Sequence, residues 1–208
     1  MSSEAAPATT SSIAANGDVL KKLETAKELK EKGDKSFQEG KLKDALASYH
    51  QSLLYLHGLD KNTLQKALGQ PLPPPPPIEA VDQAAQEKPK TEVDILQEKI
   101  YSNMSQCHLA NQNWKRAVET ADKALSLNPK NRKALFRKAK AQGELGYFEK
   151  AEKILEDLIK DAEPAEKDIC QKELDRLRAM DKERERAHNQ KLKGMCFLNK
   201  EKVDLSAD

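Results

Sequence analysis

The sequence is poor in aromatic residues, cysteines and long apolar runs. Aromatic side chains make up only 4% of its 208 residues, which favours thin helical layers over a thick core. Its three cysteines, Cys107, Cys170 and Cys196, are too few and too far apart for a disulfide framework or a zinc cluster, so we expect reduced, buried thiols. No stretch approaches the roughly 18 uninterrupted apolar residues of a membrane-spanning helix.

An excess of charge of one sign is also missing, because 36 basic side chains face 34 acidic ones and the net charge is +2. Such a balance provides no global field for nucleic acid or an anionic membrane, so we expect neither as a partner. Residues 1–18 are small, polar and partly acidic, unlike a signal or transit peptide. We therefore expect a soluble cytoplasmic protein in which any recognition by charge is local.

Sequence signatures of catalysis and metal binding are lacking too. The chain has eight glycines, none of them in the spacing of a phosphate-binding or dinucleotide-binding loop. Its histidines, His50, His57, His108 and His188, are too scattered for a metal motif, and the side chains of the neighbours Cys107 and His108 diverge on a helix. We expect no catalytic residue, no metal and no cofactor.

What the sequence does contain is an internal repeat of small residues. Ser105 and Ala139 stand 34 residues apart. In three places a small residue is followed twelve positions later by alanine. The three pairs are Gly33 and Ala45, Ser105 and Ala117, and Ala139 and Ala151. Small residues at these positions let two antiparallel helices cross closely without a void or a clash. The period indicates helix–turn–helix units.

The repeat divides the chain into seven expected segments. They are a disordered N-terminus (1–20), a first repeat (21–59), a proline-rich inserted loop (60–93), a second repeat (94–131), a third repeat (132–164), a capping helix (165–200) and a tail (201–208). The run PLPPPPP at 71–77 cannot be helical, and a spacer role is favoured over a ligand for an aromatic-lined module. The capping helix would cover an apolar face that the last repeat leaves wet.

Apolar periodicity, glycines and prolines place the helices of the repeats. The expected pairs are Lys21–Gln38 with Lys43–Leu56, Glu92–Ala110 with Trp114–Ser126, and Lys133–Glu144 with Phe148–Asp161. The predicted fold class is therefore all-α, with three helix–turn–helix repeats in a right-handed superhelix and a long C-terminal capping helix.

Three segments of the chain resemble the tetratricopeptide repeats of the large immunophilins, the peptidyl-prolyl isomerases that act as co-chaperones. They read YSNMSQCHLANQNWKRAVETADKALSLNP, KALFRKAKAQGELGYFEKAEKILEDLI and KGMCFLNKE, and the resemblance covers roughly residues 23–202. Only about twenty residues precede the repeats, far fewer than an isomerase domain needs. The chain therefore resembles a stand-alone repeat protein of the tetratricopeptide repeat protein 9 type.

This resemblance implies a peptide-binding groove lined by the first helix of each repeat. In similar co-chaperones, basic and amide groups there form a carboxylate clamp for the C-terminal Glu-Glu-Val-Asp of cytosolic chaperones. The matching positions are Lys30, Asn103, Lys133 and Arg137, of which the last two share one helical face. Their charge-assisted hydrogen bonds would hold both carboxylates of a terminal aspartate.

Asp34 departs from the clamp pattern, because many clamp proteins carry asparagine at this position. Its carboxylate would repel the bound carboxylates, by up to about 4 kcal/mol for charges ~4 Å apart at an effective dielectric of ~20. Alternatively, Asp34 pairs with Lys30 or another cation of the groove. Either arrangement would weaken binding or alter the choice of peptide.

Three functional hypotheses follow from these residues. The first is a monomeric, non-catalytic adaptor or co-chaperone that binds the C-terminal tail of heat-shock protein 90, or of heat-shock protein 70. The second is a scaffold that binds an unrelated peptide with a clamp that Asp34 has made degenerate. The third is an isomerase, an activity that a relative suggests but that no domain in this sequence supports.

Overall fold

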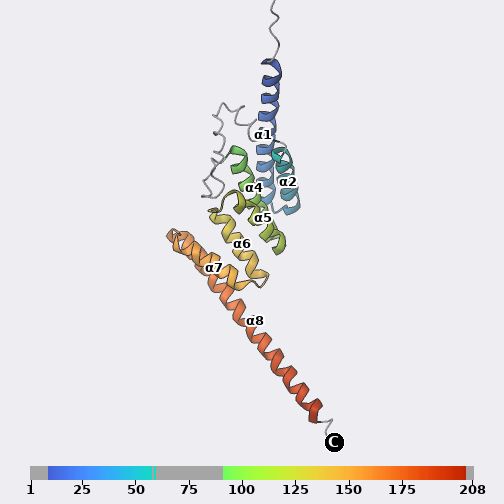
Figure 1. Ribbon diagram of the computed structural model, residues 1–208, viewed down its shortest axis with the longest axis vertical. Helices are drawn as coiled ribbons and strands as arrows, with labels where there is room; N and C mark the ends of the chain where they lie inside the picture. Colours follow the sequence, from blue (N-terminus) through green and yellow to red (C-terminus); the bar gives the residue numbers. More distant parts are fainter. Residues whose placement is uncertain (1–8, 58, 60–90, 205–208) are drawn as a thin grey trace, which may run out of the picture. The chain divides into compact units, whose positions relative to one another are not determined.

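The computed structural model describes the backbone of residues 9–57, 59 and 91–204, and the side chains of 17–57, 59 and 91–193 (Figure 1). All regular elements in these ranges are α-helices. They are α1 (Thr9–Gln38), α2 (Leu42–His57), α4 (Glu92–Ala110), α5 (Trp114–Leu127), α6 (Arg132–Glu144), α7 (Phe148–Lys160) and α8 (Pro164–Asp204). The predicted all-α class is confirmed. None of these helices combines the length and apolar character needed to cross a membrane.

Helix bounds from α2 to α7 agree with the expected ranges to within one residue. The N-terminal helix differs: α1 begins at Thr9 and so overlaps the segment 1–20 that the sequence predicts to be disordered. No proline follows Pro7 before the expected start at Lys21, and the alanines in between favour a helix. Most of the predicted loop 60–93 lies outside the described residues, and α8 continues past the expected end at Lys200.

Local signals explain where the repeat helices start and turn. Thr91 accepts a hydrogen bond at Oγ1 from the backbone N–H of Asp94 over 3.2 Å, and so forms a capping box at the start of α4. The turns after the first helix of each pair contain Gly40, Gln112 and Gly146, with φ of 78°, 55° and 88°. Gln112 and Gly146 stand 34 residues apart, which is the repeat spacing, and each of the three turns contains a left-handed residue.

The chain divides into two compact units, residues 1–134 and 135–208. In the first unit α1 packs on α2, α4 packs on α5, and α2 also contacts α4. The small-residue pairs work there as expected: a Cβ on Gly33 would come within 2.6 Å of the Tyr49 ring, and the fully buried Ser105 donates a hydrogen bond to the carbonyl of Ala117 over 2.9 Å. Glycine and serine are therefore required by close packing of the helices.

In the second unit, α7 and the beginning of α8 lie side by side around a core that includes Leu155, Leu174 and Leu177 (Figure 1). Ala139 and Ala151, the third small-residue pair, are both fully buried in this core. The predicted capping role holds for the first half of α8 only. Residues 181–193 are all exposed, and the side chain of Phe197 lies outside the described residues.

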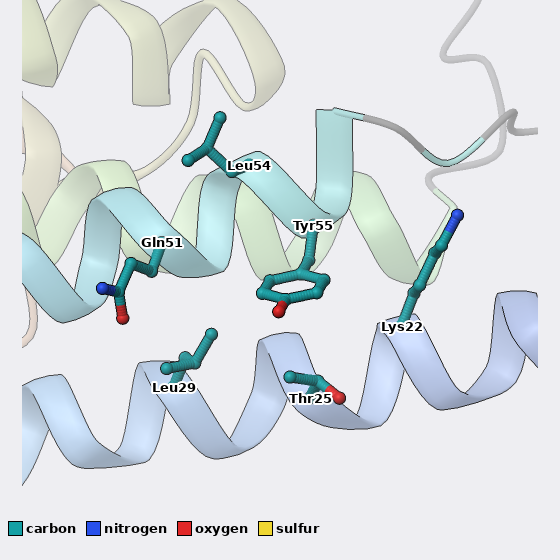
Figure 2. Close-up of a pocket in the computed structure, with 6 residues that line it drawn as sticks. All are labelled: Lys22, Thr25, Leu29, Gln51, Leu54 and Tyr55. Atoms are coloured by element: carbon teal, nitrogen blue, oxygen red, sulfur yellow. The ribbon is translucent and has the colours of Figure 1, made fainter.

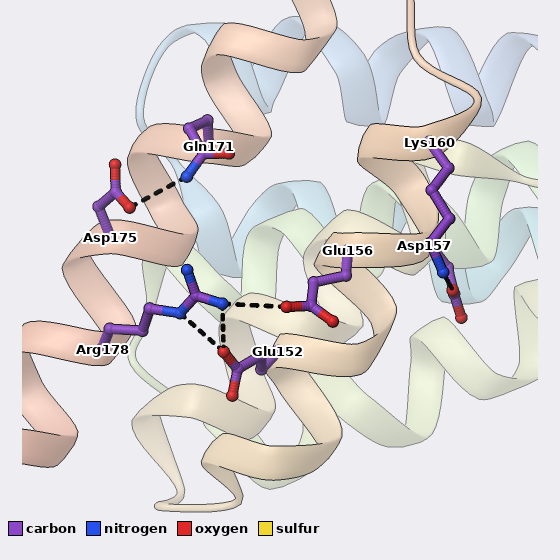
Figure 3. Close-up of polar contacts among 7 residues, drawn as sticks. All are labelled: Glu152, Glu156, Asp157, Lys160, Gln171, Asp175 and Arg178. Carbon is purple, nitrogen blue, oxygen red and sulfur yellow. Dashed lines mark hydrogen bonds and ion pairs between the residues drawn. The ribbon is translucent and has the colours of Figure 1, made fainter.

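Charged side chains join α7 to α8 on the surface of the second unit. Arg178 on α8 reaches Glu152 and Glu156 on α7 over 2.6 and 2.9 Å (Figure 3). Within α7, Lys160 pairs with Asp157 over 2.8 Å. These side chains are strongly exposed, so water and salt screen the pairs and each contributes little to stability.

Candidate functional site

Asp34 lies at the centre of a polar cluster that joins three helices of the first unit. Its Oδ2 pairs with the Nζ of Lys30, one turn earlier on α1, over 2.7 Å. Its Oδ1 accepts a hydrogen bond from the hydroxyl of Tyr49 on α2 over 2.5 Å and another from the Nδ2 of Asn103 on α4 over 2.9 Å. Lys30 and Asn103, two of the predicted clamp residues, therefore both bond to Asp34, the residue that departs from the clamp pattern.

The packing of α1 on α2 explains why Tyr49 reaches this cluster. Gly33 has no Cβ, so the Tyr49 ring lies directly against α1 and its hydroxyl arrives at the next residue, Asp34. A buried phenol needs a hydrogen-bond partner, and the carboxylate of Asp34 is that partner. Burial, and next the bond to Asp34, raise the pKa of Tyr49 far above its usual value. The phenol therefore stays protonated and acts as a donor.

The structure shows the pairing of Asp34 with Lys30 that the sequence offered as one of two alternatives. The side chains of Lys30 and Asp34 remain 24% and 30% exposed, so both are accessible from solvent. Because the ammonium has three donors, the bond to Asp34 leaves others for a ligand. Asn103 turns its amide nitrogen toward Asp34, since a carboxylate only accepts hydrogen bonds.

Lys133 and Arg137 lie one turn apart on α6, where the side chain of Asn131 accepts a hydrogen bond from the backbone N–H of Ala134 over 3.0 Å and so begins the helix. Lys133 is exposed and Arg137 is half-buried. Lys133 belongs to the first unit and Arg137 to the second. Their membership of the clamp therefore rests on the repeat register alone.

Tyr49 is a site residue that the sequence analysis did not name, because its spacing with Ala45 and Leu53 is typical of the apolar stripe of a helix. The sequence signal that could have identified it is a tyrosine on one helix of the pair and a glycine on the other, at positions where the two helices cross. A ring that packs against a glycine extends its hydroxyl past the neighbouring helix, where it needs a polar partner.

A shallow apolar hollow lies between α1 and α2, with a volume of about 540 Å³ (Figure 2). Leu29 and Thr25 line it from α1, and Gln51 and Tyr55 line it from α2. Nearby, Leu54 is 73% exposed. The hollow has few polar groups, and nothing in the described part of the chain indicates what covers it.

Metal ligands and reactive thiols do not gather in the part of the chain that the structure describes. There, no group of three or more histidine, cysteine, aspartate or glutamate residues is placed to hold a metal ion. Cys107 and Cys170 are buried and form no disulfide, as expected. The side chain of Cys196 lies outside the described residues.

Comparison with known proteins finds the same repeat. A family model described as "Tetratricopeptide repeat" matches residues 108–166. Tetratricopeptide repeat protein 9C of Xenopus tropicalis is 34% identical over 125 residues, which are 58% of this chain and 65% of that protein. The human peptidyl-prolyl cis-trans isomerase FKBP4 is 31% identical over 130 residues, 62% of this chain and 23% of the isomerase.

A third relative is the Hsp70/Hsp90 co-chaperone CNS1 of Saccharomyces cerevisiae, 39% identical over 56 residues, 27% of this chain and 14% of the co-chaperone. The chain thus spans less than two thirds of each of these three relatives.

Solved structures agree on the fold. The C-terminal tetratricopeptide domain of a putative FK506-binding protein of Plasmodium falciparum superposes with a TM-score of 0.58 at 17% identity, and covers 81% of this chain and 95% of that one. Yeast Cns1 superposes with a TM-score of 0.61 at 20% identity, over 88% of this chain and 48% of that one. At such identities the likeness concerns the fold alone.

The helix pairs of this chain have the fold of tetratricopeptide repeats, and proteins with such repeats are generally non-catalytic adaptors. More particularly, the sequence resembles tetratricopeptide repeat protein 9C and the matching regions of the isomerase FKBP4 and the co-chaperone CNS1.

Proposed function

We propose that this chain is a non-catalytic, cytoplasmic adaptor whose groove binds the C-terminal Glu-Glu-Val-Asp peptide of heat-shock protein 90 or 70. The observation that supports this proposal is the meeting of Lys30 and Asn103 at Asp34, within hydrogen-bond distance, although α1 and α4 are far apart in the sequence. The name of the relative CNS1, an Hsp70/Hsp90 co-chaperone, points in the same direction.

In this proposal the two carboxylates of the ligand's terminal aspartate accept hydrogen bonds from the clamp residues. The ammonium of Lys30 and the amide N–H of Asn103 hold one carboxylate, while Lys133 and Arg137 hold the other by charge-assisted hydrogen bonds. Asp34 lowers the net charge that the ligand meets at Lys30. The peptide therefore competes with an internal carboxylate for the same cation, and binding is weaker than in a clamp with asparagine at this position.

The test is a calorimetric titration of the full chain with a Glu-Glu-Val-Asp peptide and with the same peptide amidated at its C-terminus. Amidation should weaken binding by about 1–3 kcal/mol, and Arg137→Ala or Lys133→Ala by a similar amount, because each removes a charge-assisted bond. The control is Lys32→Ala, since Lys32 is exposed on α1 and makes no part of the cluster. Equal binding of both peptides by the unaltered chain would contradict the clamp.

The second candidate is a scaffold that binds a peptide without reading its terminal carboxylate. The engagement of both Lys30 and Asn103 by Asp34 favours this alternative, because it reduces the positive charge of the groove. Such a scaffold would bind internal peptides as well as terminal ones. Insensitivity to amidation, with a measurable affinity, would favour it over the clamp.

A further inference from the structure

A second hollow of about 230 Å³ lies in the first unit, between α2, α4 and α5. Histidines and cations dominate its polar lining. Six residues carry the argument: His50 and His57 from α2, Tyr101 and His108 from α4, and Arg116 and Lys123 from α5. We call this the histidine pocket.

The histidine pocket is separate from the clamp. Tyr101 and His108 stand about two turns apart on α4 and so share one face of that helix. Asn103, the clamp residue of α4, lies on the other side, because the angular step of about 100° per residue turns it away from both. A ligand in the histidine pocket therefore does not compete directly for Asn103.

Two cations of the pocket have no acidic partner. Arg116 and Lys123 lie on one face of α5, and in the described part of the chain no carboxylate is within ion-pair distance of either. The Lys123 ammonium lies 5.8 Å from the centre of the Tyr101 ring, a weak cation–π contact. Glu119 also lines the pocket, but its single charge does not balance two cations. The pocket is therefore positive.

His108 adds a polar group whose hydrogen-bonding capacity the protein leaves unused. The residue is only 8% exposed, and its buried Nδ1 has no hydrogen-bond partner. Buried polar atoms almost always have a partner, so an unpaired one against a hollow needs a reason. A ligand or water in the pocket is the simplest reason.

The electrostatics of the histidines agree with a positive pocket. Burial, then Lys123 and Arg116, lower the pKa of His50. Burial, then Arg116 and His50, lower the pKa of His108, and Glu119 opposes this. Both rings are therefore neutral near pH 7 and donate through one N–H each, while the two cations provide the charge.

We propose that the histidine pocket binds a tetrahedral oxyanion of the phosphate class, either a free ion or a phosphoryl group carried by a partner protein. Arginine and lysine with additional N–H donors are the side chains that bind phosphate oxygens. Here the donors come from three helices around a small volume, which suits an anion with oxygens on several sides better than a planar carboxylate.

The proposal determines the sign of the pH dependence. A bound oxyanion stabilises the protonated histidines, so it raises the pKa values of His50 and His108 and binding takes up protons. Affinity therefore rises as the pH falls below neutrality. His57, whose Nε2 lies 3.3 Å from the Tyr101 hydroxyl, and Glu119 also line the pocket, and Tyr101 stays neutral because burial raises its pKa.

The experiment is a nuclear magnetic resonance titration of the full chain with sodium sulfate, read from the histidine ring signals, at constant ionic strength. Sulfate serves as the probe because its charge does not change between pH 6 and 8. We expect saturable shifts of the His50 and His108 signals, with tighter binding at pH 6. The double variant Arg116→Gln, Lys123→Gln should bind at least about tenfold more weakly, because it removes both charged donors.

The matched control is Lys115→Gln, which removes one charge from the same helix outside the pocket. Far-ultraviolet circular dichroism checks that the variants fold. Absence of saturable shifts, equal weakening in the control, or acetate binding as tightly as sulfate would each overturn the proposal. O-phosphoserine in place of sulfate distinguishes the sources: tighter binding of the amino acid indicates a phosphorylated partner, and equal binding indicates a free ion.

Discussion

Two regions of the molecule use the same packing device with different results. In the first unit Gly33 faces the ring of Tyr49, and in the second unit Gly143 faces the side chain of Leu177. In both places an absent Cβ lets a large side chain lie against the backbone of a helix. Only Tyr49 has a polar end, and this end reaches Asp34. At Gly33 the inserted side chain itself supplies the donor, whereas at Gly143 the polar contact comes from the neighbouring Arg176, which reaches Glu144 over 2.8 Å.

The polar groups around the two glycine contacts also differ in how far they are exposed to solvent. Around Tyr49, Asp34 joins α1, α2 and α4 through half-buried hydrogen bonds, so the polar groups there are held in place by the packing of three helices. Next to Leu177, Arg176 reaches Glu144 and Glu173 over 2.8 and 2.6 Å in a half-buried cluster. The outer pairs of Arg178 with Glu152 and Glu156 are exposed. Water competes for these ion pairs, whereas it competes less for the cluster at Asp34.

The largest expected effect comes from filling the two glycine contacts. Gly33→Val and Gly143→Val should each lower the free energy of unfolding by about 1–3 kcal/mol, because the new side chain overlaps a buried one. Only Gly33→Val should also weaken peptide binding, since it displaces Tyr49 from Asp34. Urea denaturation and peptide calorimetry measure the two effects.

The control for this prediction is Gly17→Val, because a Cβ at Gly17 meets no atom within 4 Å. Its stability should stay close to that of the unaltered chain. Loss of peptide binding in Gly143→Val would contradict the view that the two glycines differ in function.

Tyr49→Phe separates the packing of the ring from its hydrogen bond. The variant keeps the ring against Gly33 but removes the donor to Asp34, so we expect a loss of about 1 kcal/mol in the free energy of unfolding. Without the hydroxyl, Asp34 keeps only Lys30 and Asn103 as partners and holds both more strongly. Peptide affinity should therefore fall slightly. A thermal melt and a peptide titration check both results. Unchanged stability would mean that water replaces the hydroxyl without loss.

Asp34→Asn removes the negative charge at the centre of the cluster while keeping the shape of the side chain. Binding of a Glu-Glu-Val-Asp peptide should tighten by about 1 kcal/mol at low salt, because the ligand no longer competes with a carboxylate for Lys30. The gain should shrink as ionic strength rises. Calorimetry at two salt concentrations measures it. Unchanged or weaker binding at low salt would show instead that Asp34 serves to hold Lys30 in position.

The smallest effect is expected in the second unit. Arg178→Gln removes both ion pairs between α8 and α7, yet the side chains are about half exposed and the free energy of unfolding should hardly change. A urea titration of the variant checks this. A large loss of stability would mean that these surface pairs are as important as the polar cluster at Asp34.

Much of the fold was predictable because its signals are local. Capping residues, turn glycines and prolines mark helix ends within a few residues of sequence, and α2 to α7 accordingly match the expected bounds. The start of α1 was not predictable in this way, since Asn16, Gly17 and Asp18 are typical of a turn and the helix nevertheless continues through them. Ser105 and Ala117 show that the repeat spacing also predicted a real contact between helices.

The sequence by itself determined the repeat and the helix pairs. It also offered the pairing of Lys30 with Asp34 as one of two alternatives, because residues four apart on a helix share a face. Only the tertiary structure decided that Tyr49 and Asn103, 15 and 69 residues from Asp34, complete the cluster. It alone also brought His50, His108 and Arg116 to one pocket. The physical reason is that such contacts depend on how helices pack, and packing is set by the fit of side chains across the whole interface rather than by spacing along the chain.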